Sequence, residues 1–275
     1  MSVPIRGPGR SPGILVGSFL SRGYFSVKIK SAVPVLRPMD RITAELFSKR
    51  DEKYAAFSES LTPCDYGFIG VRIPELRKIA KRTASECAEE YLESWEYRYF
   101  EDLMLRGLVI SYVKTDYDER MRLFSSFIPM IDNWSVCDTF CSAWKPGKKE
   151  RRAYWDFIIG YLGTGKEFQM RYSVVSMMKH YLTDGCFGRV ISEIDKTADS
   201  GYYYGTGAAW CLAECVARHP DETMDYLRGN TGLDNFIYRR ALQKSLESFR
   251  VSDSLKEEMR RMRSQIDDGG IQSSS

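Results

Sequence analysis

The residues with the clearest potential for chemistry lie in a segment that begins at Asp132. Asp132 or Asn133 can cap a helix that meets no helix breaker before Pro146. In such a helix Trp134 and Asp138 are four residues apart, so they share one face about one turn apart. An indole ring attracts a cation through its π-face, and a carboxylate does so through its charge. The spacing therefore predicts a site for a positively charged group on a rigid support.

Later helical segments supply further candidates for the same site. Arg171 and Trp210 each fall within a predicted helix. A guanidinium group can bind a phosphate through two hydrogen bonds, and helix N-termini add partial positive charge. Other basic residues fall near predicted helix ends, where they can meet phosphates: Lys145, Lys148, Lys149, Arg239, Arg240 and Lys244. We interpret these residues as lining one groove.

Taken singly, each of these residues also has a structural explanation. Trp134 and Trp210 could be core residues, since large aromatic side chains are mostly buried. Asp138 fits a solvated or locally paired helix position, and Arg171 fits a salt bridge at a rim. The lysine-rich run after Pro146 fits a solvated turn that starts the next helix.

The elements that must position these residues are all predicted to be helices. Residues 40–61 form one helix or two with a break near Ser48, and Pro74 occupies the first turn of the next. Further helices are predicted at 86–94, 97–114, 117–131, 133–144, 149–162, 166–182, 186–197, 203–218, 221–229, 233–247 and 253–264. No period-2 strand pattern appears. Helices so closely linked pack as antiparallel pairs, so the rhythm predicts an all-α, curved solenoid of helix pairs.

Composition sets limits on function but does not identify it. The chain has 275 residues, a net charge of +3 and 43% hydrophobic residues, and no apolar run approaches the roughly 18 residues of a membrane span. The first 38 residues hold six of the 40 basic residues and none of the 37 acidic ones, which leaves the rest at −3. Nucleic-acid binding would therefore require basic residues gathered on one face.

We predict a single helical domain over residues 39–264. Residues 1–38, rich in Pro, Gly, Ser and Arg, are expected to be a disordered extension outside the fold. A transit peptide, or a natural start at Met39, are alternatives. Residues 265–275 are expected to be a disordered tail.

The seven cysteines fit packing better than metal binding. Cys137 and Cys141, like Cys211 and Cys215, are four residues apart on one helix face. With only two histidines in the chain, we expect no metal site and interpret the thiols as small core residues in a reduced cytosol.

Five segments resemble, in order and spacing, the DNA alkylation repair protein family, in particular the AlkD-like HEAT-like-repeat DNA glycosylases. They are GVRIPELRKIA (70–80), NWSVCD (133–138), FQMR (168–171), AAWCLAE (208–214) and YRRALQK (238–244). The resemblance covers about residues 40–262. It implies HEAT-like repeats with a concave DNA-binding face. It also implies removal of cationic N-alkylated purines, such as 3-methyladenine and 7-methylguanine, from double-stranded DNA.

The resemblance also implies roles for individual residues. Trp134 and Trp210 match the cleft tryptophans, Asp138 the catalytic aspartate and Arg171 the cleft arginine, while Tyr54 matches an aromatic DNA contact.

The chemistry of this reaction agrees with these residue types. A cationic purine leaves as a neutral base without a general acid, so the site must stabilise the oxocarbenium-like sugar. Asp138 can do so through its charge and can position the attacking water. Each indole face attracts a cation by roughly 0.5–2 kcal/mol. No cofactor is needed, and the chain has no GxxxxGK[ST] or GxGxxG motif.

These features predict a monofunctional DNA glycosylase of base excision repair. It would act as a monomer on alkylated double-stranded DNA, in the cytoplasm at the nucleoid, without membrane contact. Nothing marks a lysine as a Schiff-base nucleophile, so no strand cleavage is expected.

Two alternatives remain. One is a non-catalytic DNA-binding relative that recognises bent or branched DNA, because Ser135, Val136 and Cys137 depart in part from the glycosylase pattern. The other is a helical-repeat scaffold for protein partners, which fully buried Trp134 and Trp210 would favour.

Overall fold

The computed structural model describes residues 38–62, 64–183, 185–197, 201–229 and 231–268. All of these residues belong to one compact unit. The predicted extension over 1–38 lies outside the described residues except for Pro38, where the first helix begins. At the other end the last helix continues to Asp268, four residues beyond the predicted domain end, because no helix breaker precedes Gly269.

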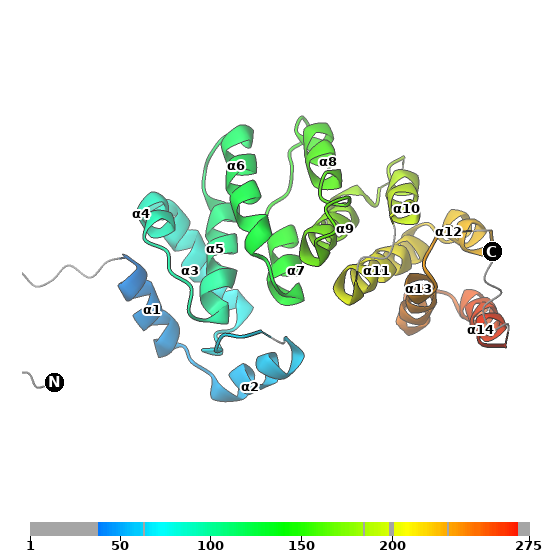
Figure 1. The fold of residues 1–275 in the computed structure, drawn as a ribbon, viewed down its shortest axis with the longest axis horizontal. Coiled ribbons are helices and arrows are strands. Elements are labelled where there is room, and N and C mark those ends of the chain that lie inside the picture. The colour runs from blue at the N-terminus through cyan, green and yellow to red at the C-terminus, as the bar shows by residue number, and fades with distance from the viewer. Residues whose placement is uncertain (1–37, 63, 184, 198–200, 230, 269–275) are drawn as a thin grey trace, which may run out of the picture. The chain divides into compact units, whose positions relative to one another are not determined.

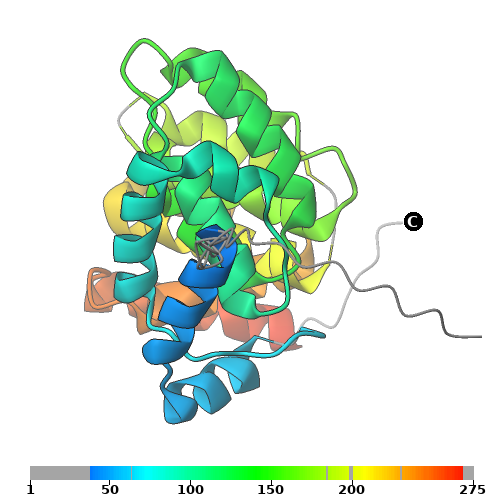
Figure 2. The same cartoon turned by 90° about the vertical axis from the view of Figure 1, so that its left-hand side faces the viewer.

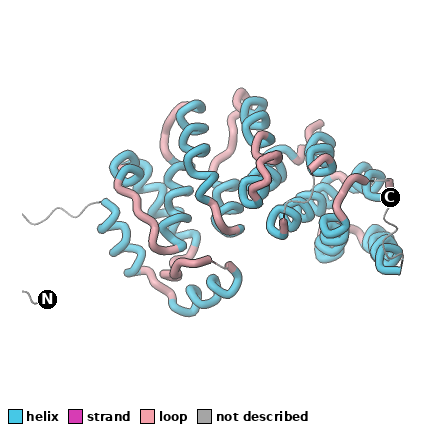
Figure 3. The backbone as a smooth tube through the Cα atoms, in the orientation of Figure 1, coloured by secondary structure: helices cyan, strands magenta, loops and turns pink. Residues whose placement is uncertain are grey.

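The described residues form helices joined by loops, and their only β-pairing is an isolated bridge between Gly67 and Tyr99 (Figure 3). In chain order the helices are α1 (Pro38–Ser48), α2 (Glu52–Leu61), α3 (Ile73–Glu86), α4 (Ala88–Glu93), α5 (Phe100–Tyr112), α6 (Tyr117–Phe127), the 3-10 helix η1 (Ile128–Met130), α7 (Trp134–Ala143), α8 (Arg151–Ile159), α9 (Glu167–Tyr181), α10 (Phe187–Asp195), α11 (Tyr202–Arg218), α12 (Pro220–Arg228), α13 (Asn235–Glu247) and α14 (Asp253–Asp268). None of them is both long and apolar enough to cross a lipid bilayer.

Local sequence signals account for where several helices begin. Of the two alternatives for residues 40–61, the structure has two helices with a break after Ser48. Helix α1 ends there, and the Asp51 carboxylate caps α2 by accepting a hydrogen bond from the Tyr54 NH at 3.0 Å. For α7 the cap is Asn133, whose side-chain oxygen accepts a hydrogen bond from the Val136 NH at 2.9 Å.

The helices are arranged in a row of neighbours (Figures 1 and 2). Helices α3, α5, α7, α9, α11 and α13 each pack on the next, so elements about 30 residues apart in sequence become adjacent. The intervening helices pack on this row, with α4 on α3, α6 on α5, α8 and α10 on α9, α12 on α11 and α14 on α13. The all-helical prediction is confirmed, and the paired arrangement is compatible with a helical-repeat solenoid.

A buried carboxylate fixes the loop between α2 and α3. Glu101 is 1% exposed and accepts backbone hydrogen bonds from Ile69 at 2.9 Å, Gly70 at 2.7 Å and Val71 at 3.0 Å. Gly70 has a φ of +93°, and a Cβ there would lie 2.2 Å from the Asp51 carbonyl oxygen. Loop 67–72 is therefore tied both to α5 and to the start of α2.

Helices α7 and α9 are joined by buried polar contacts as well as by apolar packing. The thiol of Cys141 donates to the Tyr172 carbonyl at 3.5 Å, and the imidazole Nε2 of His180 lies 3.0 Å from the Cys141 carbonyl oxygen. Cys137, Cys141, Cys211 and Cys215 are all buried free thiols, as the packing interpretation predicted. Among the described residues, no three His, Cys, Asp or Glu side chains gather as metal ligands would.

The burial of His180 predicts a loss of stability in acid. Burial lowers the pKa of His180 from 6.5 to about 4. Because the unfolded chain then binds a proton at higher pH than the folded chain, the stabilisation is complete above about pH 6.5. It is lost as the pH falls toward 4, by about 3 kcal/mol in total. Urea unfolding at pH 7 and pH 4.5 should show this loss in the wild-type chain. A His180→Gln variant should lose less over the same range, and an identical loss would contradict the assignment.

Candidate nucleic-acid groove

A groove of about 590 Å³ brings together residues from the helix row. Its walls come from the end of α2 and from α7, α9, α11 and α13. It is lined by Ser60, Leu61, Trp134, Asp138, Arg171, Tyr202, Tyr203, Thr206, Trp210, Arg240, Gln243, Lys244 and Glu247. Six of the residues proposed from the sequence are among them, namely Trp134, Asp138, Arg171, Trp210, Arg240 and Lys244.

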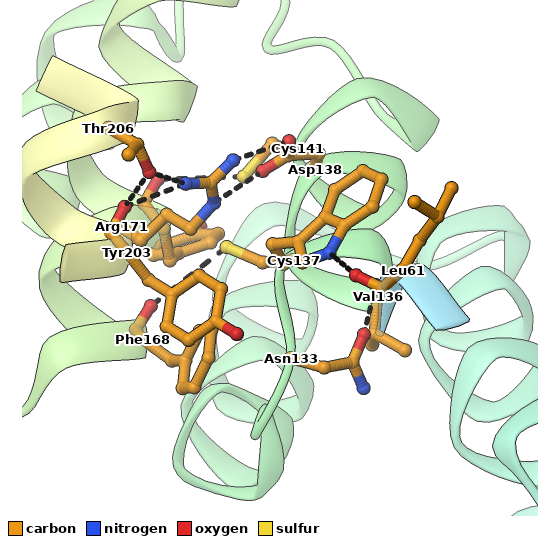
Figure 4. A network of polar contacts seen from close by, with 12 residues as sticks. Leu61, Asn133, Val136, Cys137, Asp138, Cys141, Phe168, Arg171, Tyr203 and Thr206 are labelled. Carbon is orange, nitrogen blue, oxygen red and sulfur yellow. Dashed lines mark hydrogen bonds and ion pairs between the residues drawn. The ribbon is translucent and has the colours of Figure 1, made fainter. Parts of the chain in front are cut away.

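Asp138 and Arg171 form a two-point ion pair in this groove (Figure 4). The guanidinium Nε donates to Oδ1 of Asp138 at 2.9 Å, and Nη2 donates to Oδ2 at 2.8 Å. The arginine side chain is 7% exposed and the aspartate side chain 16%, so the carboxylate is the more open of the two to the groove. Burial disfavours the charge on Arg171, but the hydrogen bonds and charge of Asp138 outweigh it and raise the pKa of Arg171.

The same guanidinium also holds the start of α11. Its Nη1 donates to the Tyr203 carbonyl at 2.6 Å and to the Thr206 hydroxyl at 3.1 Å (Figure 4). At Gly207 a Cβ would lie 3.2 Å from the Val174 side chain, which is a tight contact, so the glycine favours close packing of α11 on α9. The sequence suggested Arg171 as a phosphate ligand. The geometry favours it as the residue that orients the Asp138 carboxylate and joins α7, α9 and α11.

The two tryptophans are half-buried and flank the groove. Trp134 donates its indole NH to the Leu61 carbonyl at the end of α2, at 2.9 Å. Trp210 lies in α11, where the Lys179 ammonium is 4.6 Å from the centre of one indole ring. Neither indole is enclosed in the core. The scaffold alternative would be favoured by two fully buried tryptophans, so this arrangement does not support it.

The Trp134 hydrogen bond predicts how α2 is held. This helix has no buried residue, so its position depends on a few contacts at its ends. Trp134→Phe keeps an aromatic ring but removes the NH donor. We expect faster amide hydrogen exchange in α2 and unchanged exchange in α7, measured by mass spectrometry. Unchanged exchange in α2 would show that the bond does not anchor the helix.

The remaining residues predicted to contact DNA do not line the groove. Tyr54 lies on α2 with the Arg72 guanidinium 4.7 Å from its ring centre, and Arg239 is half-buried on α13. Three exposed lysines follow the C-terminal end of α7, away from the first turns that carry Trp134 and Asp138: Lys145, Lys148 and Lys149. These three lysines follow α7 in the sequence but do not line the groove.

Several groove residues were not selected from the sequence. Tyr202 and Tyr203 belong to a run of three tyrosines at 202–204. Tyr202 is 56% exposed, and Tyr203 rests against Phe168 with ring centres 4.9 Å apart. Helical spacing is a signal that could have found more of them. Tyr203 and Thr206 lie seven and four residues before Trp210, which was predicted, and so share one face of α11 with it. On α13, Glu247 likewise shares a face with Arg240 and Lys244, which were predicted.

Comparison with known proteins identifies the family of this chain. No curated protein matches the chain. A family model described as DNA alkylation repair enzyme matches residues 42–245, which include α7, α9, α11 and most of α13. The resemblance to this family seen in the sequence is thereby confirmed, and the match includes every residue that lines the groove except Glu247. The chain belongs to the DNA alkylation repair enzyme family.

Proposed function

We propose that this member of the alkylation repair family is a DNA glycosylase that hydrolyses the N-glycosidic bond of cationic N-alkylated purines in double-stranded DNA. The observation that carries the proposal is the Asp138 carboxylate, held at both oxygens by Arg171, in a groove that Trp134 and Trp210 flank.

The reaction needs a fixed negative charge more than it needs an acid. An alkylated purine already carries a positive charge, so it leaves with the bonding electrons as a neutral base. Water then adds to C1′ of the sugar and loses a proton. Positive charge builds on the sugar between these events, and a preorganised carboxylate lowers the free energy of that state.

Arg171 opposes this effect but does not cancel it. At an effective dielectric constant of ~20, a cation ~4 Å from the carboxylate is attracted by roughly 4 kcal/mol. The same cation ~7 Å from the guanidinium is repelled by roughly 2.4 kcal/mol. The greater exposure of Asp138 supports this order of distances. A net attraction of roughly 2 kcal/mol remains, and the ion pair holds the carboxylate in one orientation.

The walls of the groove suit the rest of the substrate. The faces of Trp134 and Trp210 can contact a cationic base or sugar. Arg240 and Lys244 on α13 supply positive charge for the phosphates of the strand.

The test is to incubate the chain with duplex DNA that contains 7-methylguanine and to measure the free base. We expect release of 7-methylguanine and formation of an abasic site without strand cleavage, and no base release from an unmethylated duplex. Salt-dependent binding without base release would overturn the proposal and identify a non-catalytic DNA-binding protein.

A further inference from the structure

Helices α8 and α10 both pack on α9 (Figure 1). Residues of α8, the end of α9 and α10 line a second hollow, apart from the groove. It has a volume of about 470 Å³ and shares no residue with the groove. We call it the α8–α10 hollow, and it is lined by Arg151, Arg152, Trp155, Asp156, Tyr181, Cys186 and Arg189. Arg151 and Arg152, which follow shortly after Lys145, Lys148 and Lys149 in the sequence, therefore lie here.

Two of its arginines rest on a rigid aromatic floor. Trp155 is 2% exposed and Tyr181 3%, and their rings meet edge to face with centres 5.0 Å apart. The Arg189 guanidinium lies 4.4 Å from the centre of the Trp155 ring, and the Arg151 guanidinium lies 4.8 Å from that of Tyr181. Arg151 is held further by a 2.7 Å hydrogen bond from Nη2 to the His180 carbonyl. These guanidinium groups are ordered before any ligand arrives, which reduces the entropy lost on binding.

The charges in the hollow are not balanced. Three guanidinium groups face one carboxylate, that of Asp156. Over the described parts of the chain, Arg151, Arg152 and Arg189 form no ion pair. Arginines elsewhere on the surface do pair with carboxylates, including Arg82, Arg98, Arg122, Arg228 and Arg250. An anion in the hollow would relieve the repulsion among its arginines.

Two helix N-termini contribute to the same potential. The hollow includes the first turn of α8 and the N-cap residue of α10, and both helices have nine residues. Neither cap residue, Glu150 or Cys186, makes a side-chain capping hydrogen bond. Helix N-termini carry partial positive charge and amide donors suited to an anion.

From this combination we propose that the α8–α10 hollow binds a phosphate group, with Arg152 and Arg189 as its exposed ligands. Guanidinium groups match the geometry of phosphate oxygens and bind them through paired hydrogen bonds. The same chemistry fits inorganic phosphate and the phosphodiester of a nucleic-acid strand. The site is independent of the groove, so it gives the chain a second point of contact with a phosphate-bearing molecule.

The experiment is isothermal titration of the full chain with two probes, inorganic phosphate and the dinucleotide TpT, at constant ionic strength set with chloride. We expect saturable binding of at least one probe. The Kd should rise about tenfold or more in the double variant Arg152→Gln, Arg189→Gln, because two charge-assisted contacts are lost. Binding of TpT alone would identify a strand phosphodiester as the ligand, and binding of phosphate would identify a small-anion site. Either result supports the proposal.

Two matched variants separate this site from general electrostatics and from the groove. Arg122→Gln removes an exposed arginine that pairs with Glu119 on α6, and it should leave the Kd of either probe unchanged. Asp138→Asn should also leave it unchanged. The single variant Arg152→Gln keeps the contact of Arg189 with Trp155. A higher Kd in this variant would therefore result from the lost contact with the ligand and not from a change in folding. No saturable binding by either probe, or equal binding by the double variant, would overturn the proposal.

Discussion

Asp138→Asn is expected to slow release of methylated purine by about 10²–10³-fold, the range seen when one preorganised electrostatic contact to a transition state is removed. The side chain keeps its shape and one oxygen acceptor for Arg171, but it loses the negative charge that faces the groove. Affinity for DNA should stay the same or rise, because a negative charge near the phosphates has been removed. Single-turnover release of 7-methylguanine, with DNA binding measured separately, distinguishes the two effects.

The control for this variant is a second carboxylate in the same groove. Glu247 lies on α13, where it accepts a hydrogen bond from Gln243 at 2.7 Å. Glu247→Gln changes the net charge of the groove by the same amount but leaves the Asp138–Arg171 pair intact, so it should change the rate little. Thermal unfolding must accompany both measurements, because Asp138→Asn leaves the buried guanidinium of Arg171 without its counter-charge. A folded Asp138→Asn variant with full activity would rule out the proposed mechanism.

Glu101→Ala is expected to cause the largest loss of stability of the substitutions considered, roughly 3–5 kcal/mol. The reason is that Ile69, Gly70 and Val71 would all lose the acceptor of a buried backbone NH. Leaving such a group without a partner costs about 1–3 kcal/mol. Urea unfolding followed by circular dichroism measures the change.

A loss of this size is a large part of the 5–15 kcal/mol that stabilises a typical domain. The matched control is Glu257→Ala in α14, which removes an exposed glutamate from a helix and should change stability by less than about 0.5 kcal/mol. Equal effects of the two substitutions would show that the three backbone contacts contribute nothing to the fold.

Local structure could be predicted because it depends on residues close together in the chain. The cap before α7, the break after Ser48 and the proline in the first turn of α3 are each specified within about one turn of helix. Spacing likewise placed Trp134 and Asp138 on one face of α7.

Which helix faces meet could not be predicted from spacing. Asp138 and Arg171 are 33 residues apart, and nothing in either segment shows that both carboxylate oxygens bind the guanidinium. The sequence therefore supported a phosphate contact for Arg171, whereas the packing of α7, α9 and α11 directs it to Asp138 and the Tyr203 carbonyl. The lysines after α7 show the same limit, because Lys145, Lys148 and Lys149 were predicted to meet DNA in the groove but do not line it.

By itself the sequence determined that the chain is helical, where several helices begin, and the family, since capping, helical spacing and ordered motifs are local properties of the chain. Only the tertiary structure decided which side chains share a groove and which charge each arginine faces. Those choices depend on how helices pack across about 30 residues of intervening chain, and the buried contacts that fix this packing form only once the chain has folded.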